Sequence, residues 1–286
     1  MPLSTSALGT SNHRTAGKPV ILIAMSSAPG ANNADASDRY VPSGSTERLL
    51  SSAKERGVAR TVIDVAEWGL RLIGGPRLAR YARQNETFTL SGIEFPYFYS
   101  WDNWTWLNER TVEIPIALAA LAAVSAHRVL EVGAVMPHYT AVSHRVVDKY
   151  EDGPGIEQAD ILDLHADQQY DLVLSVSTVE HVGWDETPRD SGKALLAIER
   201  LKDFVAPGGE LLVTLPVGYH PPLEAALRAN AETFSSVEAL RCSRRSRAWS
   251  QVPPESVAGV SYNPLTYSAS AVLICRWKRA TEQAPT

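Results

Sequence analysis

Apolar and polar positions follow two different rhythms along this chain. Over residues 46–72 the apolar residues recur at helical spacing, and Gly74-Gly75-Pro76 predicts the end of that helical region. From residue 128 onward, short apolar runs alternate with longer amphipathic stretches. Strands that alternate with helices pair mostly in parallel, so this half of the chain predicts an α/β sheet.

The predicted sheet has seven strands. They cover residues 129–132, 145–148, a segment within 157–164, 170–176, 210–215, 236–240 and 271–277. The fourth of them is apolar enough to be buried on both faces, as in a parallel sheet. Helices are predicted over 111–125, 188–205 and 223–230, with a turn at 206–209. The fold class is therefore α/β, with a doubly wound, mostly parallel seven-stranded sheet.

Composition divides the chain into three parts. Residues 1–45 are rich in small polar residues and predict a flexible N-terminal segment. Within it, the short apolar run of residues 18–31 is typical of either a strand or a secretory signal. Residues 46–107 predict a helical and aromatic cap, whose aromatic stretch 95–106 either packs on the core or lines an acceptor pocket. Residues 108–280 form the main domain. Glu109 and Arg110 at its start suit either a structural ion pair or a cofactor contact.

The stretch 128–148 organises the main domain. The apolar run Val129-Leu-Glu-Val132 breaks at Gly133, and a second apolar run ends in Asp148. This pattern predicts a strand, a ligand-facing turn, a helical crossover and a second strand tipped by a carboxylate. Gly133 lets the backbone approach a ligand, and Asp148 accepts hydrogen bonds from ribose hydroxyls. The sequence thus predicts a nucleoside-cofactor site.

Charge and cysteine content narrow the function further. A net charge of −5 argues against a nucleic-acid binder. Cys242 and Cys275 provide neither a disulfide framework nor metal-ligand spacing, which favours a cytoplasmic protein. No apolar run approaches the length of a membrane span, and no membrane partner is expected. The sequence leaves the oligomeric state open.

An ordered set of motifs resembles a known family. The set comprises Leu130-Glu-Val-Gly133, Asp148, Asp160, Glu180-His181 and Ala206-Pro-Gly-Gly209. Together these motifs resemble the class I methyltransferases that use S-adenosylmethionine. The runs EVGAVMPHY, VVDKYE, VSTVEHVGWDE and TLPVGYHP are similar to those of bacterial methyltransferases found with glycan and secondary-metabolite genes. The resemblance covers about residues 108–278 and implies a Rossmann-like fold whose seventh strand, at 271–277, is antiparallel.

The resemblance also implies a set of cofactor-binding residues. Glu131 and Gly133 would frame the methionine and ribose parts of S-adenosylmethionine, and Asp148 would bind the ribose. Asp160 with Ile161 would meet the adenine, and Ser175 and Val176 would pass beneath the sulfonium. The first turn departs from the family because only Gly133 remains of its two or three glycines. The same turn argues against an NAD(P)-dependent oxidoreductase, whose pyrophosphate needs G-x-G-x-x-G.

The expected activity is methyl transfer to a small polar acceptor, such as a hydroxyl of a sugar or a secondary metabolite. His181, just beyond the fourth strand, is the candidate catalytic base, with His138 and His220 as weaker candidates. Asp185 and Glu186 suit either a divalent metal or a solvated acidic loop. The alternative is a catalytically inactive protein of the same fold that acts as a binding partner, an interpretation motivated by the glycine-poor turn.

A cluster of arginines follows the sixth predicted strand. Arg241, Arg244, Arg245 and Arg247 lie within seven residues of one another. Guanidinium groups bind phosphate through two parallel hydrogen bonds, so this cluster suits an anionic or nucleotide-linked acceptor. A solvated face is the plainer interpretation.

Overall fold

The computed structural model describes residues 50, 53–54, 57–82, 86–166, 168–229 and 233–281. The flexible segment predicted over 1–45 lies outside these residues, as does the strand or signal predicted over 18–31. The three-part division of the chain stays a prediction.

The described residues contain one large sheet of eight strands. In spatial order they are β5 (Ile156–Gln158), β4 (Arg145–Asp148), β3 (Val129–Val132), β6 (Tyr170–Val176), β7 (Val205–Pro216), β10 (Ala271–Lys278), β8 (Ser236–Cys242) and β9 (Trp249–Val252). Neighbours from β5 to β7 pair in parallel, while β10 is antiparallel to both β7 and β8. The predicted mostly parallel α/β fold with an antiparallel strand at 271–277 is confirmed.

The strand count of seven was wrong, because β9 pairs antiparallel with β8 at the edge of the sheet. In β9 Trp249 is buried, while Ser250 and Gln251 are exposed. The composition of this short, polar segment is typical of a loop. It is a strand because it pairs with β8, a contact that its own sequence does not reveal. Ala206-Pro-Gly-Gly209, predicted as a turn, lies within β7.

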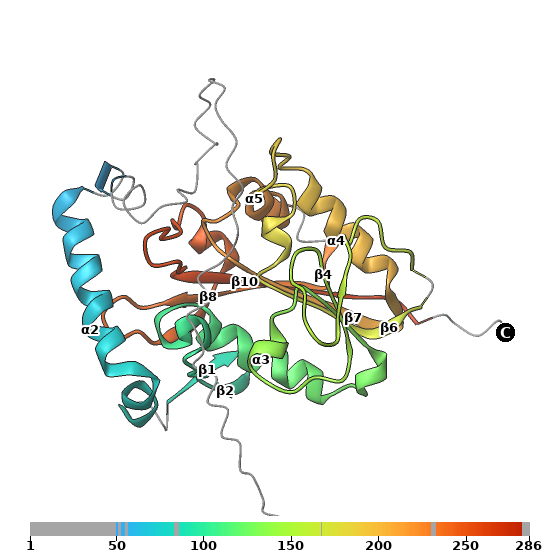
Figure 1. The fold of residues 1–286 in the computed structure, drawn as a ribbon, viewed down its shortest axis with the longest axis horizontal. Helices are drawn as coiled ribbons and strands as arrows, with labels where there is room; N and C mark the ends of the chain where they lie inside the picture. The colour runs from blue at the N-terminus through green and yellow to red at the C-terminus, as the bar shows by residue number, and fades with distance from the viewer. Residues whose placement is uncertain are drawn as a thin grey trace, which may run out of the picture. The chain divides into compact units, whose positions relative to one another are not determined.

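Helices cover both faces of the sheet (Figure 1). On one face lie α4 (Lys193–Asp203) and α5 (Pro221–Ala229), and on the other lie α3 (Arg110–Ala122) and the hairpin of β1 (Thr87–Leu90) and β2 (Ile93–Pro96). Each face of the sheet packs in its own hydrophobic core, and successive side chains of β6 point alternately into one core and the other. Val173 packs in the α4 and α5 core, whereas Leu172 and Leu174 pack in the α3 core. Burial on both faces explains its unbroken apolar sequence.

The helical crossover predicted between the first two strands of the motif is wrong. The connection from β3 to β4 contains a single 3-10 turn, η3 (Met136–His138). The carboxylate of Glu131 accepts the backbone N–H groups of Val135 at 2.9 Å and Met136 at 2.7 Å, and Pro137 has no N–H to donate. At the start of a helix the first backbone N–H groups have no partner within the helix. Here the carboxylate of Glu131 accepts two N–H groups at the corresponding place after β3.

The predicted end of the helical region at Gly74-Gly75-Pro76 is confirmed, because Gly75 has a non-helical backbone and separates the two helical segments of α2 (Val58–Ala82). Gly75 has φ 59°, and a Cβ at this position would lie 2.7 Å from the ring of Trp101. Pro76 follows as the first residue of the second helical segment, where its missing N–H does no harm. Within the described part of the chain, neither α2 nor any other helix is long and apolar enough to cross a bilayer.

The aromatic stretch packs partly on the core, where Phe95 is buried and Tyr97 and Phe98 lie against the α3 core. It contains η1 (Asp102–Leu107), whose Trp106 indole N–H donates to the carbonyl of Arg71 in α2 at 3.1 Å. At the hairpin turn, the backbone N–H of Ser91 donates to Oε1 of Gln251 in β9 at 2.9 Å. The aromatic stretch is thus hydrogen-bonded to α2, and the β1–β2 hairpin is hydrogen-bonded to β9 at the edge of the sheet.

A fully buried carboxylate, Glu113, joins α3 to the sheet. One oxygen accepts hydrogen bonds from Ser177 Oγ at 2.6 Å and Thr214 Oγ1 at 2.7 Å, and the other lies 3.3 Å from Arg110 Nη1. Arg110 Nη1 also donates to the carbonyl of Val176 at 3.1 Å. One side chain therefore fixes the start of α3 against the ends of β6 and β7.

Replacing this carboxylate should destabilise the whole domain. Glu113→Ala leaves the buried guanidinium of Arg110 without its partner, and we expect a loss of about 3–5 kcal/mol in the free energy of unfolding. Glu113→Gln keeps one acceptor oxygen for the two hydroxyls and should lose less. Denaturant unfolding monitored by circular dichroism measures both, and equal stability of wild type and Glu113→Ala would contradict the assigned role.

Candidate functional site

The predicted site residues gather at one edge of the sheet, where β3, β4, β5 and β6 end side by side. Gly133 follows β3, Asp148 ends β4, and Ser175 and Val176 end β6. From β3 the chain first adds β4 and β5 on one side and then β6 and β7 on the other. The boundary between β3 and β6 is therefore the topological switch point, the place where ligands bind in such sheets. The structure brings these residues to one edge, and their roles in binding stay predictions.

Gly133 is required by its surroundings. Its φ is 89°, which favours glycine, and a Cβ here would lie 2.0 Å from Thr178 Oγ1. The first turn and the segment after β6 are therefore in direct contact. Met136 is fully buried among the residues of the α3 core, so this large residue of the glycine-poor turn points into the core.

The side chain of Glu131 holds the first turn, which follows β3, through hydrogen bonds. Besides the two backbone N–H groups it accepts, its second oxygen lies 2.7 Å from His144 Nε2. The side chain is fully buried, and both oxygens have partners within the protein. Glu131 thus fixes the shape of the turn, and its predicted contact with a cofactor stays a prediction.

Asp148 likewise holds backbone. Its Oδ2 accepts the N–H of Ala134 at 3.1 Å, and its Oδ1 accepts those of Tyr150 and Glu151, both at 2.8 Å. Two carboxylate oxygens offer about four acceptor positions, so one stays available to a ligand donor. The half-buried carboxylate stands where β4 ends beside the first turn.

Asp160, beyond β5, forms an ion pair with Lys149 Nζ at 2.9 Å. The same ammonium lies 2.7 Å from Glu186 Oε1, and the other oxygen of Glu186 lies 2.6 Å from Lys193 Nζ. Burial opposes the charge on Asp160. The hydrogen bonds from Lys149 and from the Leu162 N–H, together with the charges of Lys149 and Lys193, outweigh burial and lower the pKa of the carboxyl. Ile161, next to it, is buried in the core.

The end of β6 combines an unpaired hydroxyl with an unusual backbone. Ser175 is fully buried, and its Oγ has no hydrogen-bond partner in the described part of the chain. Val176 is also buried, and its carbonyl accepts from Arg110. Ser177 has φ 42°, a left-handed conformation that a serine adopts only when its surroundings impose it. Its bond to Glu113 supplies that constraint.

His181 forms a dyad with an acid. Its Nδ1 lies 2.6 Å from Asp185 Oδ2, which also accepts the hydroxyl of Tyr219 at 2.7 Å. Burial disfavours the imidazolium, but the hydrogen bond to Asp185 and the charge of Glu180 outweigh it and raise the pKa of His181. With Nδ1–H donated to Asp185, Nε2 is the basic nitrogen, and 39% of the side chain remains exposed.

Glu180 is a functional candidate that residue-by-residue sequence reasoning missed. It is fully buried, neither oxygen accepts a hydrogen bond from a described residue, and the nearest cation, His181 Nε2, is 3.7 Å away. Burial raises the pKa of Glu180 to about 8. Glu109, which accepts the N–H of Ala269 at 2.7 Å, has its pKa raised to about 7 by burial and by Glu113. The sequence gives no sign that Glu180 is buried, because a single glutamate next to a histidine is as typical of an exposed loop.

The weaker histidine candidates have other partners. His220 is fully buried, stacks on Trp184 with ring centroids 4.2 Å apart, and places Nδ1 3.0 Å from the carbonyl of Glu180. Burial lowers the pKa of His220 to about 4. His138 is exposed and pairs with Glu151 at 3.0 Å. His220 thus has a backbone carbonyl as its partner, while His138 has an acid partner but lies on the exposed surface.

Asp185 and Glu186 do not form a metal site in this arrangement. Asp185 is engaged by His181 and Tyr219, and Glu186 by two lysines. No group of three or more metal-ligating side chains occurs among residues 50–281, the masked positions in that range excepted.

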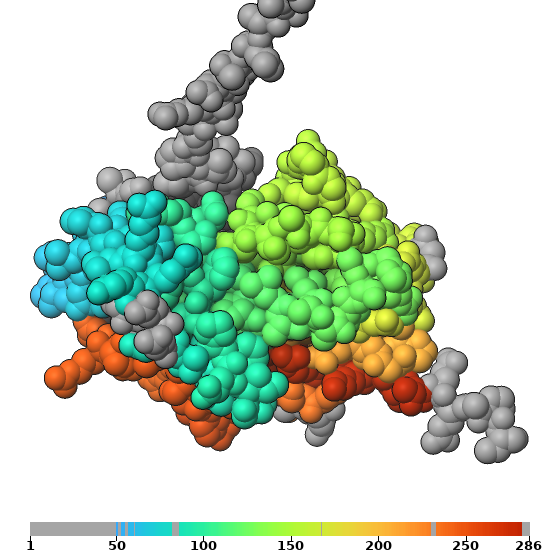
Figure 2. Space-filling model, turned by 90° about the horizontal axis from the view of Figure 1, so that it is seen from below, coloured from blue at the N-terminus to red at the C-terminus, as the bar shows by residue number. Residues whose placement is uncertain are grey.

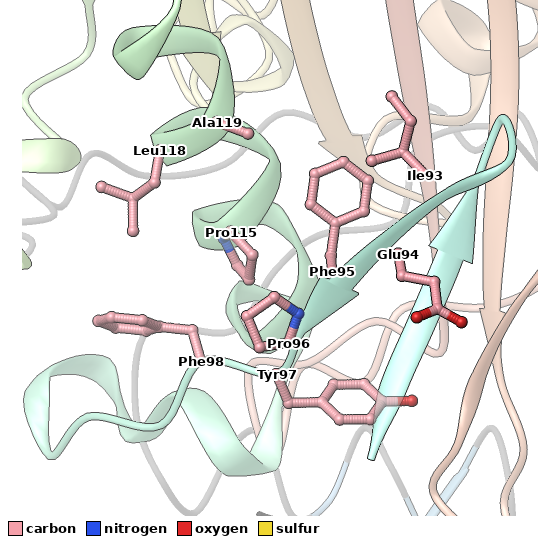
Figure 3. Close-up of a pocket in the computed structure, with 9 residues that line it drawn as sticks. All are labelled: Ile93, Glu94, Phe95, Pro96, Tyr97, Phe98, Pro115, Leu118 and Ala119. Carbon is pink, nitrogen blue, oxygen red and sulfur yellow. The ribbon is translucent and has the colours of Figure 1, made fainter. Parts of the chain in front are cut away.

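A separate apolar groove of about 320 Å³ lies between β2 and α3 (Figure 3). Phe95, Pro96 and Phe98 line it from the hairpin side, and Pro115 and Leu118 from the helix. None of the edge residues described above lines this groove. The titratable groups of its lining are Tyr97 and Glu94, and the carboxylate of Glu94 points away from the helix.

Comparisons with known proteins give likenesses of fold. No family model and no curated protein matches the chain. Among solved structures, the chain is similar to N-methyltransferase NodS from Bradyrhizobium japonicum WM9 with S-adenosyl-l-homocysteine, at 16% identity over 60% of this chain and 87% of that one, TM-score 0.38. It is similar to a possible histamine N-methyltransferase from Thermotoga maritima at 14% identity over 63% and 94%, TM-score 0.35. The CcbJ methyltransferase from Streptomyces caelestis matches at 13% over 59% and 88%, TM-score 0.30.

The sheet is doubly wound and Rossmann-like, with the antiparallel strand β10 between β7 and β8. An antiparallel strand over 271–277 is what the resemblance to class I methyltransferases implied, and β9 extends the sheet beyond it.

The buried carboxyl of Glu180 should make stability depend on pH. Because its pKa is raised to about 8, its contribution is present at low pH and is lost as the pH rises through that value. Glu180→Gln removes the ionisation, so its melting temperature relative to wild type should rise by roughly 2–4 °C or more between pH 6 and pH 9. Differential scanning calorimetry measures the difference, and a constant difference across this range would show that Glu180 is ionised in the folded protein.

Proposed function

We propose that this protein transfers a methyl group from S-adenosylmethionine to a hydroxyl of a small polar acceptor, a sugar or a secondary metabolite. The observation that carries the proposal is the His181–Asp185 dyad at the end of β6, the strand next to Gly133 at the switch point. A base held there by an acid suits the removal of a proton from an acceptor hydroxyl.

The edge suits this cofactor in two respects. Asp148 keeps an acceptor position for a ribose hydroxyl, and the buried Ser175 hydroxyl at the end of β6 lacks a partner. The carboxylate of Asp148 has no cationic partner among the ion pairs of the described residues, and its negative charge favours a cationic sulfonium compound over an anionic ligand. When bound, S-adenosylmethionine supplies a methyl group already activated by its sulfonium.

The same edge argues against a dinucleotide. A pyrophosphate binds at the N-terminus of the helix that follows the first strand. Here a single 3-10 turn follows β3, and Glu131 already takes the N–H groups of Val135 and Met136. An NAD(P)-dependent oxidoreductase is therefore disfavoured.

The protein's own contribution is proton removal and orientation. Asp185 holds His181 through Nδ1, so Nε2 takes the acceptor proton and Asp185 stabilises the resulting imidazolium. The hydroxyl of Tyr219 donates to the same carboxylate oxygen, and its ring lies against the imidazole with centroids 4.7 Å apart. Both contacts limit the rotation of the base.

Cofactor binding tests the first half of the proposal. Asp148→Ala should weaken the binding of S-adenosylmethionine about tenfold or more, because a hydrogen bond to a charged group is lost. The control is Asp163→Ala, which removes an exposed carboxylate from the loop after β5. Isothermal titration calorimetry gives both affinities. If wild type binds neither S-adenosylmethionine nor its demethylated product, the alternative of a catalytically inactive binding protein is favoured.

Proton removal tests the second half. His181→Ala should reduce labelled methyl transfer to a panel of sugars and metabolites about a hundredfold, with nearly unchanged cofactor affinity. Asp185→Asn should lower the pKa of His181, because the hydrogen bond from Asp185 raises it in wild type. NMR titration of the imidazole then shows the imidazolium deprotonating at lower pH. Full turnover of His181→Ala would remove His181 from the catalytic role.

A further inference from the structure

Glu180 is a buried acid for which the protein supplies no hydrogen-bond donor. Its side chain is fully buried, and neither carboxylate oxygen accepts a hydrogen bond from a described residue. Burial of such a group costs free energy unless it is paired or neutral, so an unpaired one calls for an explanation. The proton removal proposed for His181 and Asp185 gives Glu180 no role.

The surroundings of Glu180 come from several elements. Figure 2 shows α3 and the β1–β2 hairpin as neighbouring surface on one face of the molecule, and the charged residues at the start of α3 reach the end of β6 from that face. The charged and titratable groups around Glu180 are Arg110 and Glu113 of α3, His181 and Asp185 of its own segment, Tyr219 and His220 of the loop after β7, and Tyr262 of the loop before β10.

Each cation of this cluster already has an acid of its own. Arg110 Nη1 lies 3.3 Å from Glu113 Oε2, and His181 Nδ1 lies 2.6 Å from Asp185 Oδ2. Among the ion pairs of the described residues, the one cation near Glu180 is His181, whose Nε2 lies 3.7 Å from Oε1. A ligand that carries a positive charge would therefore complete the pairing of the cluster.

The cluster borders the switch point of the sheet. Glu180 lies in the 3-10 turn η4 (Val179–His181), directly after Thr178, whose side chain touches the first turn at Gly133. The cofactor proposed for this edge carries a positive charge on its sulfur, and the product that remains after methyl transfer does not. An opposite charge nearby favours the ionised form of a carboxyl, so a cation bound beside η4 would ionise Glu180.

We propose that the carboxylate of Glu180 compensates the sulfonium charge of bound S-adenosylmethionine and then receives, through His181, the proton removed from the acceptor. This role rests on the proposed methyl transfer and gives the removed proton a destination inside the protein. Glu180 acts through His181 and does not touch the acceptor, so it is a positioning residue for the base.

The proposed step conserves charge in the buried cluster. The O–H bond of the acceptor breaks, its proton bonds to Nε2 of His181, and the electron pair of the oxygen takes the methyl group. The imidazolium then passes a proton to an oxygen of Glu180, for which the gap of 3.7 Å must close by about half an ångström to hydrogen-bond distance. One positive and one negative charge disappear together, so no unpaired charge is left in the interior.

The titration of Glu180 agrees with this cycle. Because burial raises its pKa to about 8, the carboxyl is mostly protonated at neutral pH in the ligand-free protein. Binding of a cation would release that proton, and binding of the neutral product would not. Glu109 is the competing buried acid, with its pKa raised to about 7, but it already accepts the N–H of Ala269 at 2.7 Å.

Proton release on ligand binding tests the proposal. Isothermal titration calorimetry near neutral pH, in buffers of different ionisation enthalpy, counts the protons released. Wild type should release about half a proton or more when it binds S-adenosylmethionine, and Glu180→Gln should release less by that amount. The affinity of Glu180→Gln for S-adenosylmethionine should fall about tenfold, with little change for the demethylated product. Comparing the two proteins removes any contribution from the amino group of the ligand.

The matched control is Glu224→Gln in α5. Glu224 is buried like Glu180, but it accepts the N–H groups of Gly218 at 2.7 Å and His220 at 3.2 Å. Glu224→Gln should therefore release protons like wild type. Methyl transfer should fall about tenfold in Glu180→Gln, and Glu180→Asp, which keeps an ionisable carboxyl, should recover part of both the proton release and the turnover.

Two results would overturn the role of Glu180 and leave the proposed methyl transfer intact. One is a wild type that transfers methyl groups while its proton release and its preference for S-adenosylmethionine over the product equal those of Glu180→Gln. The other is proton release that persists in Glu180→Gln and disappears in Glu109→Gln. If wild type binds neither sulfur compound, the proposed function fails, and the role of Glu180 fails with it.

Discussion

The buried carboxylate of Glu113 is the interaction on which the arrangement of the site depends. A charged group without water is stable only when its partners are close and well placed, and Glu113 finds them in Ser177, Thr214 and Arg110. Two of these partners lie at the ends of adjacent parallel strands. The requirement to satisfy one charge therefore fixes α3, β6 and β7 relative to one another. It also holds the left-handed backbone of Ser177, from which the segment bearing His181 begins.

A second carboxylate, Glu131, does the same on the other side of the switch point. Its backbone contacts replace the helix expected after β3, so the edge offers a ligand no cluster of free N–H groups. Glu131, with Asp148, which accepts the N–H of Ala134, explains how a first turn with one glycine keeps its shape. Both buried glutamates have partners within the protein, Arg110 for Glu113 and His144 for Glu131.

The sequence predicted much of this fold because its signals were local. The apolar runs of β6 and β10 are properties of neighbouring residues, and both strands were predicted nearly at their observed bounds. The helix predicted over 188–205 begins only at Lys193, and the strand predicted over 210–215 already begins at Val205. The missing crossover helix and strand β9 were not predictable in this way. The first depends on Glu131 reaching Val135 and Met136, and the second on pairing with β8. Similarly, the burial of Glu180 is set by contacts between residues distant in sequence.

The contact between the cap and strand β9 has a consequence for solubility at high concentration. An outermost strand carries free peptide groups that can recruit a strand from another molecule, which is a common start of aggregation. Ser91 reaches the β9 side chain Gln251, which in turn donates to Glu238, so the hairpin turn shields this border. At the opposite border β5 is only three residues long, and its Glu157 is paired with Arg145 at 2.8 Å. Both borders of the sheet are thereby protected against strand exchange.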